Sequence, residues 1–174
     1  FLGASLSTNA SWDATTVALS GPKRTFGDLM ALAADVVLRP HFTSADIQRE
    51  QALRQAGLVA ERDNPGAVAN RVFYRNVYPM AHPYHRTLNG DSASTALLDS
   101  ATVRGFWTRA ADPRRATLIL TGDITPTEAR EWATRYFGNW TAPARALALT
   151  DAEQVPAAPS HATRVILVDK PHAP

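Results

Sequence analysis

The stretch ATLILTGDITPTEAREWATRYFG, residues 116–138, combines a strand pattern, a turn and a capped helix in one run. Residues 116–121 are a continuous apolar run rich in β-favouring side chains, and its length suits a buried strand. After the turn, Thr125 and Glu128 have the spacing of a capping box at the start of a helix. Gly138 ends that helix and predicts a left-handed C-cap. The apolar face that this helix should bury consists of Ala129, Trp132, Ala133, Tyr136 and Phe137.

Four more helices are predicted upstream from apolar spacing and capping residues. Pro40 should end the first near residue 39, and Thr43 can cap a second that runs to about residue 62. Asn64 starts a third, and a fourth begins at residue 99 or 100 and ends before Asp112. The faces predicted to be buried are Leu29, Leu32, Ala33, Val36 and Val37 in the first helix, Ile47, Leu53, Ala56 and Ala60 in the second, Ala69, Val72, Phe73 and Val77 in the third, and Val103, Phe106, Trp107 and Ala110 in the fourth.

Residues 14–19 and 163–168 have the patterns of further strands, one near each end of the chain. Strands at the ends with helices between them predict an α+β fold, a two-layer sandwich whose mainly antiparallel sheet is covered by helices on one face. Residues 78–94 are predicted to be a long loop. We divide the chain into a domain over residues 1–140, a linker over 141–160, and a segment over 161–174. That last segment is expected to be a closing strand or the first strand of a following domain.

The composition of the chain excludes several classes of protein. The 174 residues carry a formal net charge of +2, and no basic run is dense enough to predict nucleic-acid binding. There is no cysteine, hence no disulfide or thiolate chemistry, and no apolar stretch is long enough to span a membrane. The chain starts at Phe1 without Met, so we interpret it as a fragment of a longer product, either periplasmic or cytoplasmic.

The titratable residues form no recognised catalytic or metal-binding motif. Neither H-E-x-x-H nor H-x-x-E-H occurs, and there is no G-x-S-x-G. His82 and His85 are the one close histidine pair. They could coordinate a metal if a third ligand came from elsewhere, but an ordinary loop is the stronger interpretation. Glu50 and Glu61 share one predicted helix about three turns apart, where a solvated surface carboxylate is the default.

Four segments, in order, resemble the pitrilysin/insulinase family of zinc metallopeptidases. They are FGDLMALAADVVLRPHFTSADIQRE (26–50), ERDNPGAVANRVFYRNVYPMAHPYHRTLNG (61–90), VRGFWTRAADPRRATLILTGDITPTEAREWATRYFGNW (103–140) and VILVDKPHAP (165–174). The last is similar to the strand that opens the following homologous half in that family. The resemblance covers nearly the whole chain.

The same resemblance implies that the zinc site is missing from this chain. The family's H-x-x-E-H lies on a helix that would precede Phe1, and its third ligand is a glutamate seven residues after the one matched by Glu50. Gly57 occupies that position and has no side chain to bind a metal. The family's asparagine in the substrate-pairing strand corresponds to about Ser7. The segment Leu6, Ser7, Thr8 and Asn9 is therefore the candidate peptide-binding edge, with an ordinary edge strand as the equally simple interpretation.

The sequence thus predicts a non-catalytic domain that helps enclose a peptide, with zinc held by a homologous catalytic domain in the parent or partner chain. Two alternatives stay open. In one, the chain is part of a catalytic unit in which Glu50 or Glu61 is the ligand. In the other, it is a scaffold subunit without proteolytic function. Expected partners are the catalytic domain and a peptide substrate, with no nucleic acid and no membrane segment.

Overall fold

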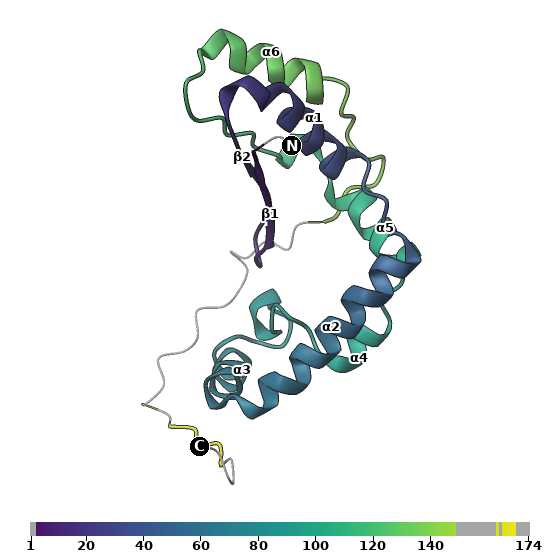
Figure 1. Cartoon of the computed structure of the whole chain (residues 1–174). Coiled ribbons are helices and arrows are strands. Elements are labelled where there is room, and N and C mark those ends of the chain that lie inside the picture. Colours follow the sequence, from purple (N-terminus) through teal and green to yellow (C-terminus); the bar gives the residue numbers. More distant parts are fainter. Residues whose placement is uncertain (1–2, 149–162, 164, 170–174) are drawn as a thin grey trace. The chain divides into compact units, whose positions relative to one another are not determined.

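The computed structural model describes residues 3–148, 163 and 165–169, and they fall into two compact units (Figure 1). Of the described residues, 3–42 and 101–147 form the first unit, and the second is built on 43–100. Within the described residues the fold is α+β, with a small antiparallel sheet and several helices. None of the described helices combines the length and the apolarity that crossing a bilayer requires.

The first unit begins with an antiparallel hairpin and continues with three helices. Strand β1 (Ser5–Ala10) pairs with β2 (Thr15–Ser20) in a register that sets Ser5 opposite Ser20. A short 3-10 turn, η1 (Lys23–Thr25), leads into α1 (Phe26–Leu38), and η3 (Pro113–Arg115) follows α5 (Ser100–Ala110). Helix α6 (Pro126–Phe137) packs against α1, and α1 also packs against β2.

The core of the first unit lies on one face of α1. Leu29, Met30 and Ala34 are buried there, and the ring of Phe26 lies 4.9 Å from that of Trp132 on α6. The α6 face predicted from the sequence is at least half-buried throughout, as expected for an amphipathic helix. The prediction for α1 is partly wrong, because Leu32 keeps 39% of its surface exposed while Met30 is buried instead.

The start of α6 is formed by the predicted capping box. The Thr125 hydroxyl accepts from the Glu128 N–H, and the Glu128 carboxylate accepts from the Thr125 N–H at 2.8 Å. That backbone hydrogen bond is the largest cause of the lowered pKa of Glu128, and the hydrogen bond from the Thr125 hydroxyl is the second. The stabilisation is therefore present at neutral pH and is lost as the pH falls through the lowered pKa.

Two predictions for residues 116–138 are wrong. Residues 116–121 form no strand, because none of the described segments supplies a backbone ladder for them, and Ile119 is 77% exposed. The sheet within the described residues therefore has two strands. Gly138 is right-handed, with φ −61°, and not left-handed. Glycine is needed there for a different reason, because a Cβ would collide with the carbonyl oxygen of Thr134.

The second unit is helical. Helix α2 (Ser44–Asp63) starts at the predicted cap, where the Thr43 side chain accepts from the Asp46 N–H. Helix α3 (Pro65–Val77) starts at Asn64, whose side chain accepts from the Ala67 N–H. The segment predicted to be a loop over residues 78–94 contains the 3-10 turn η2 (Pro83–His85) and the start of α4 (Ser92–Ala96). Side chains of α2 hold α4, since Gln51 donates to the Thr95 carbonyl at 2.9 Å and Gln55 donates to that of Ser92 at 2.8 Å.

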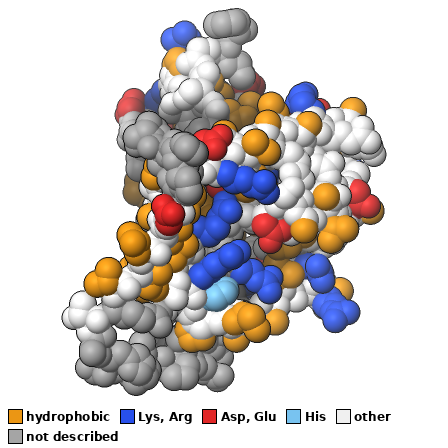
Figure 2. Space-filling view, turned by 90° about the horizontal axis from the view of Figure 1, so that it is seen from below, with side chains coloured by type: hydrophobic (Ala, Val, Ile, Leu, Met, Phe, Trp, Pro, Cys, Tyr) orange, Lys and Arg blue, Asp and Glu red, His pale blue; other side chains and the backbone are white. Residues whose placement is uncertain are grey.

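Helix α3 has its apolar stripe on the outside. Phe73 and Val77 are 57% and 44% exposed, so the prediction that this face is buried is wrong. The reason is that Arg71, on another side of the helix, turns inward to pair with α2. Hydrophobic side chains open to solvent are also visible as orange atoms in Figure 2. The strand predicted over 163–168 is absent from its described residues, and Val165 and Leu167 are 87% and 91% exposed. Most of the predicted linker lies outside the described residues.

Candidate functional site

Gly57, at the position where the resemblance places a third zinc ligand, lies in the middle of α2. It is exposed, and a Cβ built on it would meet no atom of another element within 4 Å. The fold therefore does not require glycine at this position, and a side chain would fit. The backbone is helical, so glycine here only weakens the helix.

We expect Gly57→Ala to raise the free energy of unfolding by about 0.8–1 kcal/mol, because alanine loses less backbone entropy in a helix interior. Urea denaturation of the chain would measure the change. Gly66→Ala serves as the contrast, because its Cβ would lie 3.2 Å from the Asn64 Oδ1 that caps α3. A loss of stability in Gly57→Ala would show that the glycine has a packing role that the structure does not contain.

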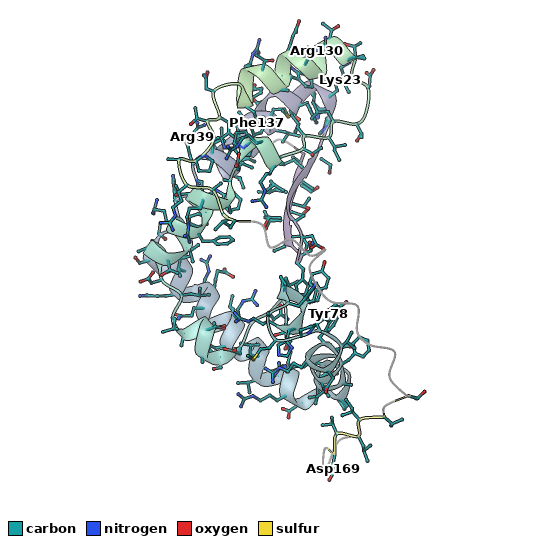
Figure 3. All side chains as sticks on the ribbon, turned by 180° about the vertical axis from the view of Figure 1, so that it is seen from behind. Lys23, Arg39, Tyr78, Arg130, Phe137 and Asp169 are labelled. Atoms are coloured by element: carbon teal, nitrogen blue, oxygen red, sulfur yellow. The ribbon has the colours of Figure 1, made fainter. Side chains whose placement is uncertain are left out.

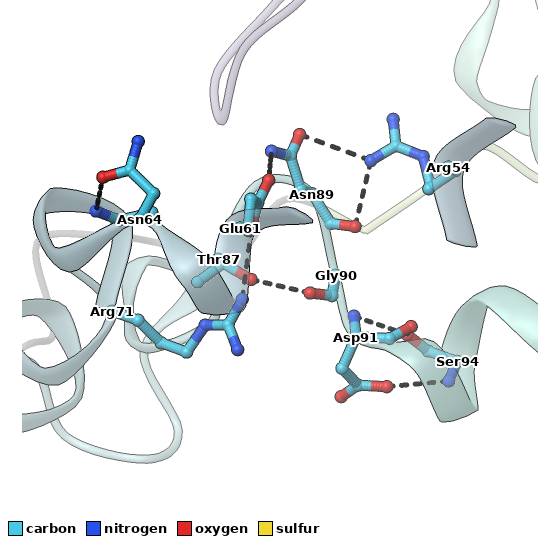
Figure 4. A network of polar contacts seen from close by, with 10 residues as sticks. Arg54, Glu61, Asn64, Arg71, Thr87, Asn89, Gly90, Asp91 and Ser94 are labelled. Atoms are coloured by element: carbon cyan, nitrogen blue, oxygen red, sulfur yellow. Dashed lines mark hydrogen bonds and ion pairs between the residues drawn. The ribbon is translucent and has the colours of Figure 1, made fainter. Parts of the chain in front are cut away.

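Glu61, the first carboxylate candidate, lies at the centre of a polar network between α2, α3 and the loop before α4 (Figure 4). Its Oε2 accepts from Arg71 Nη2 at 3.1 Å, and its Oε1 accepts from Asn89 Nδ2 at 2.7 Å. Arg54 donates to the carbonyl of Asn89 at 3.0 Å. The Glu61 and Arg71 side chains are 28% and 29% exposed, so this is a partly buried ion pair that fixes the loop to both helices. Both oxygens of Glu61 are thus already engaged.

The residues around Asn89 extend the same network. The Thr87 hydroxyl donates to the carbonyl of Gly90 at 2.8 Å, and Gly90 has φ 69°, which favours glycine. Asp91 caps α4 through the N–H of Ser94 at 2.7 Å. That backbone hydrogen bond is the main cause that lowers the pKa of Asp91. These contacts give the loop a defined conformation next to Glu61.

Glu50, the second carboxylate candidate, lies on the surface of α2. Its side chain is 63% exposed, and its Oε1 lies 3.4 Å from Nη2 of the adjacent Arg49. The structure therefore does not bring Glu50 and Glu61 together. Their separation of about three helical turns is the one expected from their spacing in the sequence.

His82 and His85 are both used to fold the loop at η2. His82 is 9% exposed, and its Nδ1 accepts from the N–H of Tyr84 at 3.0 Å. Its ring stacks on Tyr78 with a centroid distance of 4.8 Å. His85 Nδ1 lies 2.9 Å from the carbonyl oxygen of Tyr78. Each histidine thus has one ring nitrogen committed to the backbone. Throughout the described part of the chain, no group of three or more His, Asp or Glu side chains could hold a metal.

The candidate peptide-binding segment Leu6, Ser7, Thr8 and Asn9 lies within β1. Every residue of β1 is exposed, and β2 pairs with it along one edge only. Among the described residues, the other edge of β1 has no neighbouring strand. The backbone geometry required for strand addition is therefore present, and the side chains next to it are small and polar, apart from Leu6.

Sequence reasoning missed the partners of Glu61. Arg71 lies ten residues further on, in a different helix, and Asn89 lies in a segment predicted to be a loop. The one available signal was the Asn64-Pro65 break, which turns the chain and lets α3 return toward α2. Such a break does not indicate which side of α3 faces inward.

Residues 98–173 match the family model of the peptidase M16 inactive domain. No curated protein is significantly similar to the chain in sequence. Among solved structures, the chain is similar to the peptidase M16 inactive domain from Pseudomonas fluorescens, with a TM-score of 0.75 and 25% identity over 85% of this chain and 36% of that one. A protease from Helicobacter pylori has a TM-score of 0.77 and 16% identity over 86% and 36% of the two chains.

The first half of the periplasmic protease PqqL from Escherichia coli has a TM-score of 0.72 and 18% identity, over 83% of this chain and 31% of that one. The last two likenesses concern the fold alone. The chain spans only about a third of the length of these structures, at 36%, 36% and 31%. The match to the inactive-domain model over residues 98–173 and the shared fold agree with the degenerate pitrilysin-family domain predicted from the sequence.

Proposed function

We propose that this chain is a non-catalytic domain of a zinc metallopeptidase, which helps to form the chamber around a peptide and does not bind the zinc itself. The observation that carries the proposal is Gly57, an open helical position without a side chain where the resemblance places the third ligand. The match to an inactive M16 domain supports it. The zinc would belong to a homologous catalytic domain in the parent or a partner chain.

The two-layer sandwich expected from the sequence is part of this proposal. Residues 116–121 have a strand's composition but no ladder within the described residues. In the complete parent protein, these residues would join a larger sheet, whose helical cover includes α1 and α6. The division into a domain over 1–140, a linker over 141–160 and the start of a following domain at 161–174 belongs to the same proposal.

Peptide recognition would occur by strand addition to the open edge of β1. Backbone hydrogen bonds at such an edge bind extended peptides with little dependence on their sequence. The exposed positions Ser7 and Thr8 would lie beside the peptide backbone. The small side chains along β1 leave room for an incoming strand.

Ser7→Pro and Thr8→Pro in the parent peptidase test this edge, because successive N–H groups of a strand point to opposite edges. We expect one variant to raise the KM for an extended peptide severalfold with little change in kcat, since proline removes the donor on the open edge. The other variant should break the β1–β2 ladder and lower the melting temperature. An unchanged KM in both variants would contradict peptide binding at β1.

For the isolated chain, we expect no stoichiometric zinc and no peptide cleavage, because the matched ligand position is Gly57 and Glu61 is held by Arg71 and Asn89. Metal analysis after dialysis against micromolar zinc, together with a fluorogenic peptide assay, measures both. One tightly bound zinc per chain would refute the non-catalytic assignment. If Glu61→Gln then released that zinc, the alternative in which Glu61 is the ligand would be supported.

A further inference from the structure

The first unit contains an open cavity of about 1330 Å³ that the proposed function does not use. It lies between the C-terminal half of α1, helix α5, the end of α6 and residues 139–144. Figure 3 labels Arg39 at the end of α1 and Phe137 at the end of α6, which mark this region. We call this cavity the arginine groove. The side chains that matter for its chemistry are Arg39, Arg104, Arg135, Trp107, Tyr136 and Trp140.

One rim of the arginine groove is held in a fixed and strained conformation. Phe42 has φ 44°, and it is the one non-glycine residue with a positive φ in the described part of the chain. Arg104 Nη2 donates to the carbonyl of His41 at 2.5 Å, and Trp107 Nε1 donates to that of Val37 at 2.9 Å. A bulky residue adopts this backbone conformation only where its surroundings impose it. The rim is therefore preformed, and a ligand would not have to order it.

The charges in the arginine groove are unbalanced. Arg39 pairs with Asp35, which is the one acidic residue in the lining. Arg135 has no ion-pair partner among the described residues, and Arg104 donates one hydrogen bond to a neutral carbonyl. Two guanidinium groups are thus uncompensated, beside a wall of aromatic rings. Guanidinium groups bind carboxylates through paired hydrogen bonds, and aromatic walls favour apolar side chains.

We propose that the arginine groove binds an acidic peptide segment, with carboxylates at Arg104 and Arg135 and an apolar side chain against Trp107 and Trp140. A nucleic acid is the weaker fit, because the chain has a formal net charge of only +2 and no extended basic stripe. This binding site is separate from the β1 edge. It can be tested on the 174-residue chain without a catalytic domain, so its failure would leave the chamber proposal untouched.

The test uses three labelled peptides of equal length that alternate phenylalanine with glutamate, glutamine or lysine, and it measures their binding by fluorescence anisotropy. We expect the glutamate peptide to bind and the lysine peptide not to bind. Arg135→Glu should weaken binding of the glutamate peptide by about tenfold, as reversal of one charge in a close pair does. The effect should shrink when the salt concentration is raised, because the groove is open to solvent.

Arg130→Glu is the matched control. Arg130 lies on the same helix, five residues before Arg135, and does not line the arginine groove; it is labelled in Figure 3. Its reversal changes the net charge equally. We expect Arg130→Glu to keep the affinity within about twofold, because Arg130 does not line the arginine groove and its exposed charge is screened by salt. Trp140→Ala is an independent test: it should also weaken binding of the glutamate peptide, and it leaves every charge in place. If Arg135→Glu unfolds the chain, Arg135→Gln replaces it.

Equal losses in Arg130→Glu and Arg135→Glu would overturn the proposal, because binding would then follow net charge alone. Equal binding of the glutamate and lysine peptides would also overturn it. So would tighter binding of a single-stranded oligonucleotide with the same number of charges, which would mean that the groove binds phosphates in preference to carboxylates.

Discussion

Leu29→Ala is expected to lower the free energy of unfolding of the first unit by about 3 kcal/mol, within the range found for buried leucines. Leu29 is 1% exposed and is the largest fully buried side chain in the described part of the chain. It fills the space between α1 and the end of β2 so closely that a Cβ on Gly21 would lie 2.6 Å from its Cδ1. Truncation leaves a cavity that these neighbours cannot easily close.

Leu32→Ala on the same helix is the control, since Leu32 is 39% exposed and its truncation removes much less buried area. We expect a loss of about 1 kcal/mol or less there. Urea denaturation followed by circular dichroism measures both variants, provided that the m-value is unchanged. Equal losses in the two variants would mean that the core of the first unit lies elsewhere than on the buried face of α1.

Glu61→Ala is expected to destabilise the second unit by about 2 kcal/mol, because it leaves a partly buried Arg71 guanidinium without its carboxylate. The Asn89 side chain loses its acceptor at the same time. Hydrogen exchange of the amides in residues 86–91 should accelerate along with the loss of stability, since this loop is held through Asn89 (Figure 4).

Glu50→Ala serves as the matched control on the same helix, with the same chemical change. Its ion pair with Arg49 is largely exposed, so we expect a loss of about 0.5 kcal/mol or less. If the two variants lost equal stability, Glu61 would be a surface carboxylate like Glu50 and the network would contribute nothing. If neither variant changed exchange in residues 86–91, the loop would be held by contacts other than Glu61.

The sequence predicted the local structure of the chain well. Thr43, Asn64 and Thr125 start helices as expected, because each cap depends on residues within one helical turn. Pro40 likewise follows the end of α1 as predicted. Such signals are short-range, so these helix ends form from local sequence alone and do not depend on tertiary contacts.

Long-range structure was predicted less well. The apolar stripe of α3 predicted a buried face, but Phe73 and Val77 are exposed, and the partly buried Arg71 faces α2, where its partner Glu61 lies. Residues 116–121 have a strand's composition, but a strand also needs a neighbouring strand, which composition cannot supply. The arginine groove was not predicted at all, because Arg104 and Arg135 come from helices far apart in the sequence.

The exposed segment over residues 116–121 has a practical consequence for work with the isolated chain. It is apolar, β-favouring and uncharged, and within the described residues its backbone has no ladder partner. Two such segments from different molecules can form backbone hydrogen bonds with each other, which is the usual first step of aggregation through strand edges. A charged residue at the open position Ile119, which is 77% exposed, would discourage this pairing and should extend the concentration range over which the chain stays monomeric.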